Sequence, residues 1–277
     1  MSGVIERSMA LLERLAQNID GLALAEIADD LQIPKSAAHR LLSDLVGKGY
    51  VRQSRERGNY FLTTQFISLG LNYLKISGVM EKCQPVLDGL AGKCGEFVQL
   101  AVVDVDRLSW IGRSQGARSG LLYNGTNSEV ILSSSSTGLA WLCTLSENDA
   151  LHLVARQGYT TPAPNAPSTP MALLRRLRAA RKLGYALTID SYSPGLAAIA
   201  VPVLREAGGA VGVLTISGPS VRLGEDRLRA FLPDLLNASK AIAQATEASP
   251  LFNRPYSRES HASVARRPRR KAVLAAA

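Results

Sequence analysis

Residues 22–45 read LALAEIADDLQIPKSAAHRLLSDL, and this stretch decides the fold of the first part of the chain. Apolar residues recur at helical spacing on both sides of Gln32-Ile33-Pro34, a pattern that predicts two short helices joined by a tight turn. Proline cannot continue a helix but is tolerated where one begins, so the second helix should start near Lys35. The stretch therefore has the form of a helix-turn-helix.

The open side of the second helix carries small and basic side chains, as expected of a helix whose N-terminal end enters the major groove of DNA. Hydroxyls and backbone amides there can reach phosphates, while Arg40 reaches base edges. The residues of this helix expected to contact DNA are Lys35, Ser36, Ala37, His39, Arg40 and Ser43. The alternative is a helical hairpin within a bundle, which needs no exposed basic face.

The distribution of charge favours nucleic-acid binding over the hairpin. Residues 1–34 hold two basic residues against six acidic ones, whereas residues 35–57 hold six basic residues against two acidic ones. Positive charge thus begins at the second helix, where a polyanion would dock.

A basic hairpin is expected to follow, with short strands at 50–52 and 60–62 around the polar turn SRERGN. Together with a first helix over 4–18, this makes a winged helix-turn-helix, whose wing lies beside the phosphate backbone. The wing residues expected to contact DNA are Arg55, Arg57 and Asn59. For either arginine a solvated turn is the alternative.

The length of 277 residues suits about two domains, and a hydrophobic content of 46% is ample for packed cores. No apolar run approaches the roughly 20 residues of a membrane span, and the N-terminus carries glutamates, unlike a secretory signal. The three cysteines, Cys83, Cys94 and Cys143, are too few and too scattered for a disulfide framework or a zinc site. We therefore expect a cytoplasmic protein without a membrane segment, a metal site or a cofactor.

The remainder of the chain predicts helices packed on a mainly antiparallel sheet, which is an α+β fold. REAGG joins the last two strands as a hairpin turn, and Pro202 within a strand indicates an edge or a bulge. The expected helices lie at 64–78, 79–93, 139–145, 171–183 and 226–245. The expected strands lie at 97–103, 107–113, 119–124, 185–189, 199–204 and 210–217.

The net charge of +9 is concentrated near the C-terminus. From Ser249 onward seven basic residues stand against one acidic residue, in a stretch rich in proline and serine with little periodicity. Such a stretch is expected to be disordered. Its RRPRRK run could hold nucleic acid loosely, and a solvated tail explains the run equally well.

Several segments resemble, in order and in spacing, the IclR (isocitrate-lyase-regulator) family of bacterial transcription regulators, over residues 4–245. The segments are RSMALLERLA, LAEIADDLQIPKSAAHRLLSDLVGKGYV, NYFLTTQFISLG, STGLAWL, LRAARKLGYAL, PGLAAIAVPV and GVLTISGP. The resemblance implies a winged helix-turn-helix dimer or tetramer. It also implies a C-terminal GAF-like α/β domain that binds a small metabolite, typically an organic acid or an aromatic compound, and thereby changes operator affinity.

The chain is accordingly expected to form two domains with a connecting helix and a tail. The expected bounds are 1–63 for the winged helix-turn-helix domain, 64–80 for the linker helix, 81–248 for the effector-binding domain and 249–277 for the basic tail. In the family, pocket residues come from segments that fall here on residues 135–138 and 188–198 and on Thr215 and Ser217. Within the second of these segments, the expected pocket residues are Thr188, Asp190 and Ala198.

A site for an effector carboxylate is expected at residues 135–138, because this run precedes a helix, where free amides and the helix dipole favour an anion. Thr215 and Ser217 lie two apart on one strand, so they point to the same face and could complete the polar end. The residues of the run are Ser135, Ser136, Thr137 and Gly138, and the expected apolar walls are Leu100, Trp110, Ile131 and Trp141. The alternative is that the serines merely cap the helix.

Catalysis is not expected. A hydrolase needs a nucleophile with a positioned base, and the histidines are His39, His152 and His261, with no G-x-S-x-G, H-E-x-x-H or P-loop pattern. A metabolite-binding sensor without sequence-specific DNA binding would leave the helix-turn-helix unexplained. The sequence therefore predicts a DNA-binding transcription regulator whose operator affinity is modulated by a small-molecule effector, with the sensor and the small-molecule hydrolase as alternatives.

Overall fold

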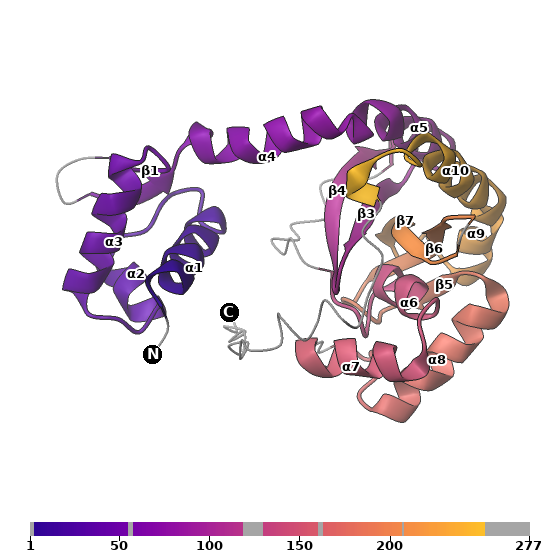
Figure 1. Ribbon diagram of the computed structural model, residues 1–277. Helices are drawn as coiled ribbons and strands as arrows, with labels where there is room; N and C mark the ends of the chain where they lie inside the picture. The colour runs from indigo at the N-terminus through magenta and orange to yellow at the C-terminus, as the bar shows by residue number, and fades with distance from the viewer. Residues whose placement is uncertain (1–2, 55–57, 119–129, 160–162, 207, 253–277) are drawn as a thin grey trace. The chain divides into compact units, whose positions relative to one another are not determined.

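The computed structural model describes residues 3–54, 58–118, 130–159, 163–206 and 208–252. The strand expected at 119–124, the wing residues Arg55 and Arg57, and the chain from 253 onward lie outside these ranges. The described chain forms two compact units, divided between Ile76 and Ser77 (Figure 1). The expected α+β fold with two domains is confirmed.

The first unit contains the expected three helices, the two-stranded wing and one further helix. Pro34 stands directly before the third helix, and Gln32 takes a left-handed backbone conformation, with φ of 51°, in the turn between the second and third. The elements are α1 (Val4–Ala16), α2 (Leu24–Asp30), α3 (Lys35–Gly47), β1 (Val51–Gln53), β2 (Tyr60–Leu62) and α4 (Thr64–Ser77).

Apolar side chains from α1, α2, α3 and the wing form the core of the first unit. Leu11, Ile27 and Leu42 are fully buried in it, and Leu22 pairs with Tyr60 to tie the α1–α2 loop to β2. The apolar side of α3 is buried in this core, and its opposite side is left exposed.

The second unit is built on an antiparallel sheet with the strand order β4-β3-β7-β6-β5. The strands are β3 (Phe97–Asp104), β4 (Arg107–Gln115), β5 (Ala186–Ile189), β6 (Leu196–Leu204) and β7 (Ala210–Pro219). Figure 1 shows helices on both sides of this sheet. The helices are α5 (Val79–Cys94), α6 (Ser136–Leu142), α7 (Glu147–Gln157), α8 (Pro170–Leu183), α9 (Glu225–Ala230), α10 (Leu232–Ala245) and the short 3-10 helix η1 (Pro250–Phe252).

Helices α5 and α10 pack together against one face of the sheet, and α6 packs with α8 against the other. On the α6 side, Ala101, Val213 and Ala200 join the buried core that includes the fully buried Trp141. None of the described helices is long and apolar enough to cross a membrane.

Three details differ from the sequence expectations. Helix α6 begins at Ser136, three residues earlier than expected, and β6 begins at Leu196 rather than at 199. Helix α7 was not expected, because its buried stripe is limited to Ala150, Leu153 and Val154 within an otherwise polar segment.

Pro202 meets both expectations for a proline within a strand. Strand β5 pairs with β6 only as far as Ala200, so Pro202 lies where β6 has an open edge on that side. A register shift against β7 follows at once, between Val203 and Leu204. The missing N–H of Pro202 therefore costs no hydrogen bond between β6 and β5.

The packed chain continues to Phe252, so the expected start of the disordered tail at 249 is corrected. Leu251 and Phe252 are buried, and Phe252 packs near Gly212 of β7. The guanidinium of Arg205 donates hydrogen bonds to the carbonyl oxygens of Ala243 and Thr246 (the latter at 2.6 Å), which holds the end of α10 beside this segment. Apolar burial overrides the polar composition of the surrounding stretch.

We predict that Phe252→Ala lowers the free energy of unfolding of the second unit by about 3–5 kcal/mol, because a fully buried aromatic ring leaves a cavity. Urea denaturation followed by circular dichroism measures the change. Truncation after Phe252 is the control and should leave the unfolding midpoint unchanged. A truncation after Ala248 that is as stable as the full chain would contradict the structural role of η1.

Candidate DNA-binding surface and effector cavity

The open face of α3 matches the surface expected to contact DNA. Its buried stripe comprises Ala38, Leu41, Leu42 and Leu45. On the other side, Lys35, Ser36, His39, Arg40 and Ser43 are exposed, and Ala37 is partly exposed. Hydroxyl, imidazole and guanidinium groups thus lie along one accessible face of a helix that starts directly after a proline.

The described part of the wing adds one basic residue that the sequence reasoning did not select. Arg52 is exposed on β1, and its guanidinium lies 4.5 Å from the centroid of the Phe61 ring. Asn59, by contrast, is partly buried, and its amide Nδ2 donates to the carbonyl oxygen of Asp20 at 3.5 Å. Asn59 thus stabilises the base of the wing. Arg52 could have been selected from the sequence, because it is one of the six basic residues counted over 35–57.

A cavity that is partly open to solvent lies in the second unit between the sheet and the start of α6. Side chains from all five strands of the sheet, from α6 and from two loops line it. The expected residues in the lining are Trp110, Ile131, Ser135, Ser136, Thr137, Thr188, Ala198, Thr215 and Ser217. The lining residues that the sequence reasoning missed are Gln99, Val130, Tyr192 and Leu196.

Two expected wall residues do not line the cavity. Leu100 is fully buried on the opposite face of β3, because side chains alternate along a strand and its neighbour Gln99 faces the cavity. Trp141 is fully buried in the core beneath α6.

Gly138 and Asp190 also lie outside the lining and serve the fold. A Cβ on Gly138 would stand 2.4 Å from the carbonyl oxygen of Leu132, so the glycine permits close packing. Asp190 has a φ of 51°, and its Oδ1 accepts hydrogen bonds from the amide of Gly195 at 2.6 Å and from Ser220 Oγ at 3.4 Å. These contacts hold the loop that carries Tyr192 into the cavity.

Three hydroxyls of the lining are already engaged within the protein. Ser135 Oγ accepts from the amide of Gly138 at 2.9 Å and donates to the carbonyl oxygen of Ile131 at 2.5 Å, so it caps α6. Thr137 Oγ1 and Thr215 Oγ1 share a hydrogen bond of 2.8 Å that joins α6 to β7. The helix-capping alternative is therefore realised at Ser135.

Four other polar side chains face the cavity without a hydrogen bond to any described residue. They are between 1% and 8% exposed, so they have little contact with bulk solvent. Buried polar groups are normally paired, and these groups need water or a ligand as partner. They are Gln99, Ser136, Thr188 and Ser217.

The lining itself carries no Lys, Arg, His, Asp or Glu among the described residues. Trp110 and Tyr192 add aromatic surface to the walls. The cavity is thus a partly apolar site with neutral donors and acceptors, as small-molecule sites usually are. The described chain also contains no cluster of three His, Cys, Asp or Glu side chains that could hold a metal ion.

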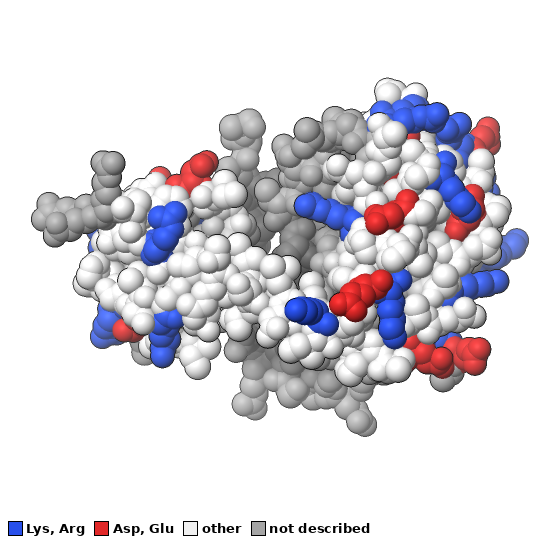
Figure 2. Space-filling model, turned by 90° about the horizontal axis from the view of Figure 1, so that it is seen from above, with Lys and Arg blue, Asp and Glu red and all other residues white. Residues whose placement is uncertain are grey.

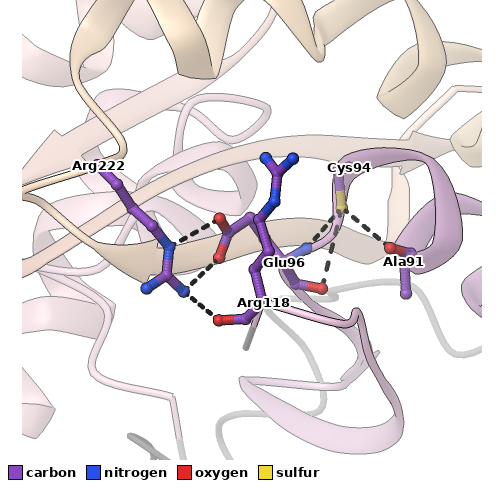
Figure 3. Close-up of polar contacts among 5 residues, drawn as sticks. All are labelled: Ala91, Cys94, Glu96, Arg118 and Arg222. Carbon is purple, nitrogen blue, oxygen red and sulfur yellow. Dashed lines mark hydrogen bonds and ion pairs between the residues drawn. The ribbon is translucent and has the colours of Figure 1, made fainter. Parts of the chain in front are cut away.

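An ion pair between the buried Glu96 and the exposed Arg222 holds the end of the sheet next to the cavity (Figure 3). Both carboxylate oxygens of Glu96 accept hydrogen bonds from the guanidinium of Arg222, each at 2.9 Å, and Arg222 also donates to the carbonyl oxygen of Arg118 at 2.5 Å. These hydrogen bonds to Glu96 raise the pKa of Arg222. A Cβ on Gly218 would stand 2.7 Å from Glu96 Oε2, so the pair lies close to the strand that carries Ser217.

The cysteines offer no activated nucleophile. Burial raises the pKa of the Cys83 thiol to about 11 and also raises the pKa values of Cys94 and Cys143. Because the thiolate is the reactive form, these thiols stay protonated and unreactive at neutral pH.

The surface of the second unit visible in Figure 2 mixes basic and acidic side chains. Such mixed charge does not form the single-sign patch that a nucleic-acid backbone requires. On the face shown, the second unit therefore presents no such patch.

Comparison with known proteins agrees with this division of the chain. Residues 4–55 match the IclR helix-turn-helix domain, and residues 71–244 match the C-terminal domain of bacterial IclR transcriptional regulators. The transcriptional repressor IclR of Escherichia coli is 28% identical over 243 residues, which cover 87% of this chain and 89% of that protein.

Solved structures of IclR regulators share the fold. An IclR-family regulator from Brucella abortus has 26% identity and a TM-score of 0.72, over 88% of this chain and 92% of that one. An IclR homologue from Microbacterium hydrocarbonoxydans, solved in complex with 4-hydroxybenzoate, has 21% identity and a TM-score of 0.72, over 89% of this chain and all of that one.

The chain belongs to the IclR family of bacterial transcriptional regulators. It is a transcription regulator with a helix-turn-helix DNA-binding domain and a C-terminal effector-binding domain. The expected family and function are confirmed, and the matched relatives are regulators of transcription.

Proposed function

We propose that the protein binds a roughly palindromic operator in the bacterial cytoplasm as a homodimer or tetramer, with one α3 in each major-groove half-site. The observation that carries this proposal is the exposed face of α3 opposite its buried leucine stripe. A single helix covers only a few base pairs, so two-fold symmetry supplies the remaining specificity. Arg40 reads base edges, and Lys35, Ser36 and the wing contact phosphates.

We predict that Arg40→Ala weakens operator binding by about 1–3 kcal/mol and relaxes specificity at one position of each half-site, because a guanine contact is lost. Footprinting and fluorescence anisotropy at fixed salt measure both effects. The matched control is Arg175→Ala, which removes the same charge from an exposed position on α8. Equal affinity and specificity in wild type and Arg40→Ala would rule out this role for Arg40.

Self-association is supported by the apolar surface of α4. None of its residues is buried, although it carries Ile67, Leu69, Leu71, Tyr73 and Ile76, all of which are exposed. A broad apolar face of a helix is normally covered. We propose that α4 of a second copy covers it.

We predict that Leu69→Glu combined with Ile76→Glu shifts the protein toward the monomer, because two charges would be buried in the apolar contact. Sedimentation velocity measures the shift. Asn72→Glu introduces a charge at an exposed, already polar position of the same helix and should leave the assembly intact. An unchanged dimer in the double variant would exclude α4 as the interface, and a change from tetramer to dimer would assign α4 to one of two interfaces.

We further propose that the cavity of the second unit binds a small organic acid, which can be aromatic, and that binding changes operator affinity. The four polar side chains of the lining that have no hydrogen bond to any described residue support a ligand with several hydrogen-bonding groups. Trp110, Ile131 and Tyr192 would contact its apolar part. The 4-hydroxybenzoate bound by the Microbacterium homologue is a compound of this class.

We predict that Ala198→Leu abolishes effector binding. Ala198 lies on the cavity floor between its cross-strand neighbours Ser217 and Thr188, so a leucine would occupy the ligand volume. A thermal-shift screen of small carboxylic acids, including 4-hydroxybenzoate, measures binding, since a ligand stabilises the folded state by mass action. Ala179→Leu, at an exposed position of α8, is the control. An acid that stabilises the wild type and Ala198→Leu equally would place its site elsewhere.

A further inference from the structure

A β-bulge in β4 changes which of its side chains face the cavity. Gly112 pairs with Leu100 and Trp110 with Ala101, so Ile111 is an extra residue in β4. Before the bulge, Leu108 and Trp110 face the α6 side of the sheet. An inserted residue reverses the alternation beyond it.

Contacts with α5 confirm the reversal. Ser114 Oγ donates to Asp88 of α5 at 2.6 Å, and a Cβ on Gly112 would stand 2.9 Å from the side chains of Met80 and Leu87 of α5. Residues 112 and 114 therefore face α5. Arg113, between them, faces the cavity side of the sheet.

Arg113 stands directly opposite Gln99, one of the four unpartnered polar residues of the cavity. Opposite residues of an antiparallel pair have Cβ atoms about 5 Å apart on the same face. Arg113 is exposed, and its guanidinium forms no ion pair or hydrogen bond within the described chain. A cation on a long, rotatable side chain is thus available at the β3–β4 end of the cavity.

An anionic ligand needs such a group, because the described residues of the lining carry no charge. The run at 135–138 is a poor substitute, since Ser135 caps the amide of Gly138 and Thr137 is bound to Thr215. Burying a carboxylate without a charged partner or a full set of donors is costly.

We propose that Arg113, together with the side-chain amide of Gln99, binds the carboxylate of the effector. Arg113 is thereby the residue that selects acids over their neutral analogues. This assignment rests on the proposed function of the cavity as an effector site. A planar guanidinium can form two parallel hydrogen bonds to a carboxylate, and the Gln99 amide can add a third.

The test compares acids with their amides, namely 4-hydroxybenzoate with 4-hydroxybenzamide, benzoate with benzamide, and lactate with lactamide. Binding to the full-length protein is measured by thermal shift and calorimetry for wild type, Arg113→Met, Arg113→Lys and Ala198→Leu. Arg107→Met is the control for loss of one positive charge on the same strand. Arg107 is exposed, and its neighbour Asp106 retains an ion pair with Arg156 at 2.6 Å.

We expect Arg113→Met to weaken binding of the acid about 10- to 100-fold, as for loss of a hydrogen bond between charged groups, and to leave the amide within about 2-fold. Arg113→Lys should restore part of the affinity, because it keeps the charge but not the paired geometry. Arg107→Met should bind both compounds like the wild type, and Ala198→Leu should bind neither.

Four outcomes overturn the assignment. If the acid binds Arg113→Met as tightly as wild type while Ala198→Leu abolishes binding, the cavity stands and Arg113 has no part in it. If Arg113→Met loses acid and amide equally, its role is structural. If only amides bind the wild type, the effector is not an acid. If neither acids nor amides bind the wild type, both the assignment of Arg113 and the proposed effector site fail.

Discussion

The second unit depends on the alternation of side chains across a five-stranded antiparallel sheet. One face is mostly apolar, because α5 and α10 cover it. The other face is divided along the strands. One half, with Ala101 and Val213, packs against the core beneath α6, whereas the other half carries Gln99, Thr215 and Ser217. The antiparallel register aligns these polar halves side by side, so that they form one cavity rather than scattered polar defects.

Within that cavity, hydrogen bonding separates side chains that maintain the fold from side chains available to a ligand. The Ser135 hydroxyl accepts a hydrogen bond from the amide of Gly138 at the start of α6, and the hydrogen bond between Thr137 and Thr215 joins α6 to the sheet. Gln99 and Ser217 have no such task among the described residues. Because polar groups inside a protein normally have partners, these two side chains are open to hydrogen bonds from water or a ligand. Asp190 and the Glu96–Arg222 pair do not line the cavity. They hold the loop and the strand end that border it.

The sequence by itself determined the class of the protein and most of its elements. Helical periodicity with a central proline at 22–45, and the change of charge sign after residue 34, were sufficient for the helix-turn-helix, because these are local properties of the chain. The family resemblance located the cavity-forming segments, and Thr188, Ala198, Thr215 and Ser217 do line the cavity. Helix α7 was missed because its buried stripe is short, and η1 was missed because polar neighbours surround two buried residues.

Only the tertiary structure decided which side of each buried strand faces the cavity. The run 97–103 is buried on both faces, so its sequence does not show whether Gln99 or Leu100 lines the site. The bulge at Ile111 is likewise invisible in the sequence, although it determines that Trp110 and Arg113 share a face of β4. Periodicity specifies that side chains alternate, but the packing of α5 and α6 on opposite faces selects one of the two registers, since a slip of one residue would exchange core and cavity.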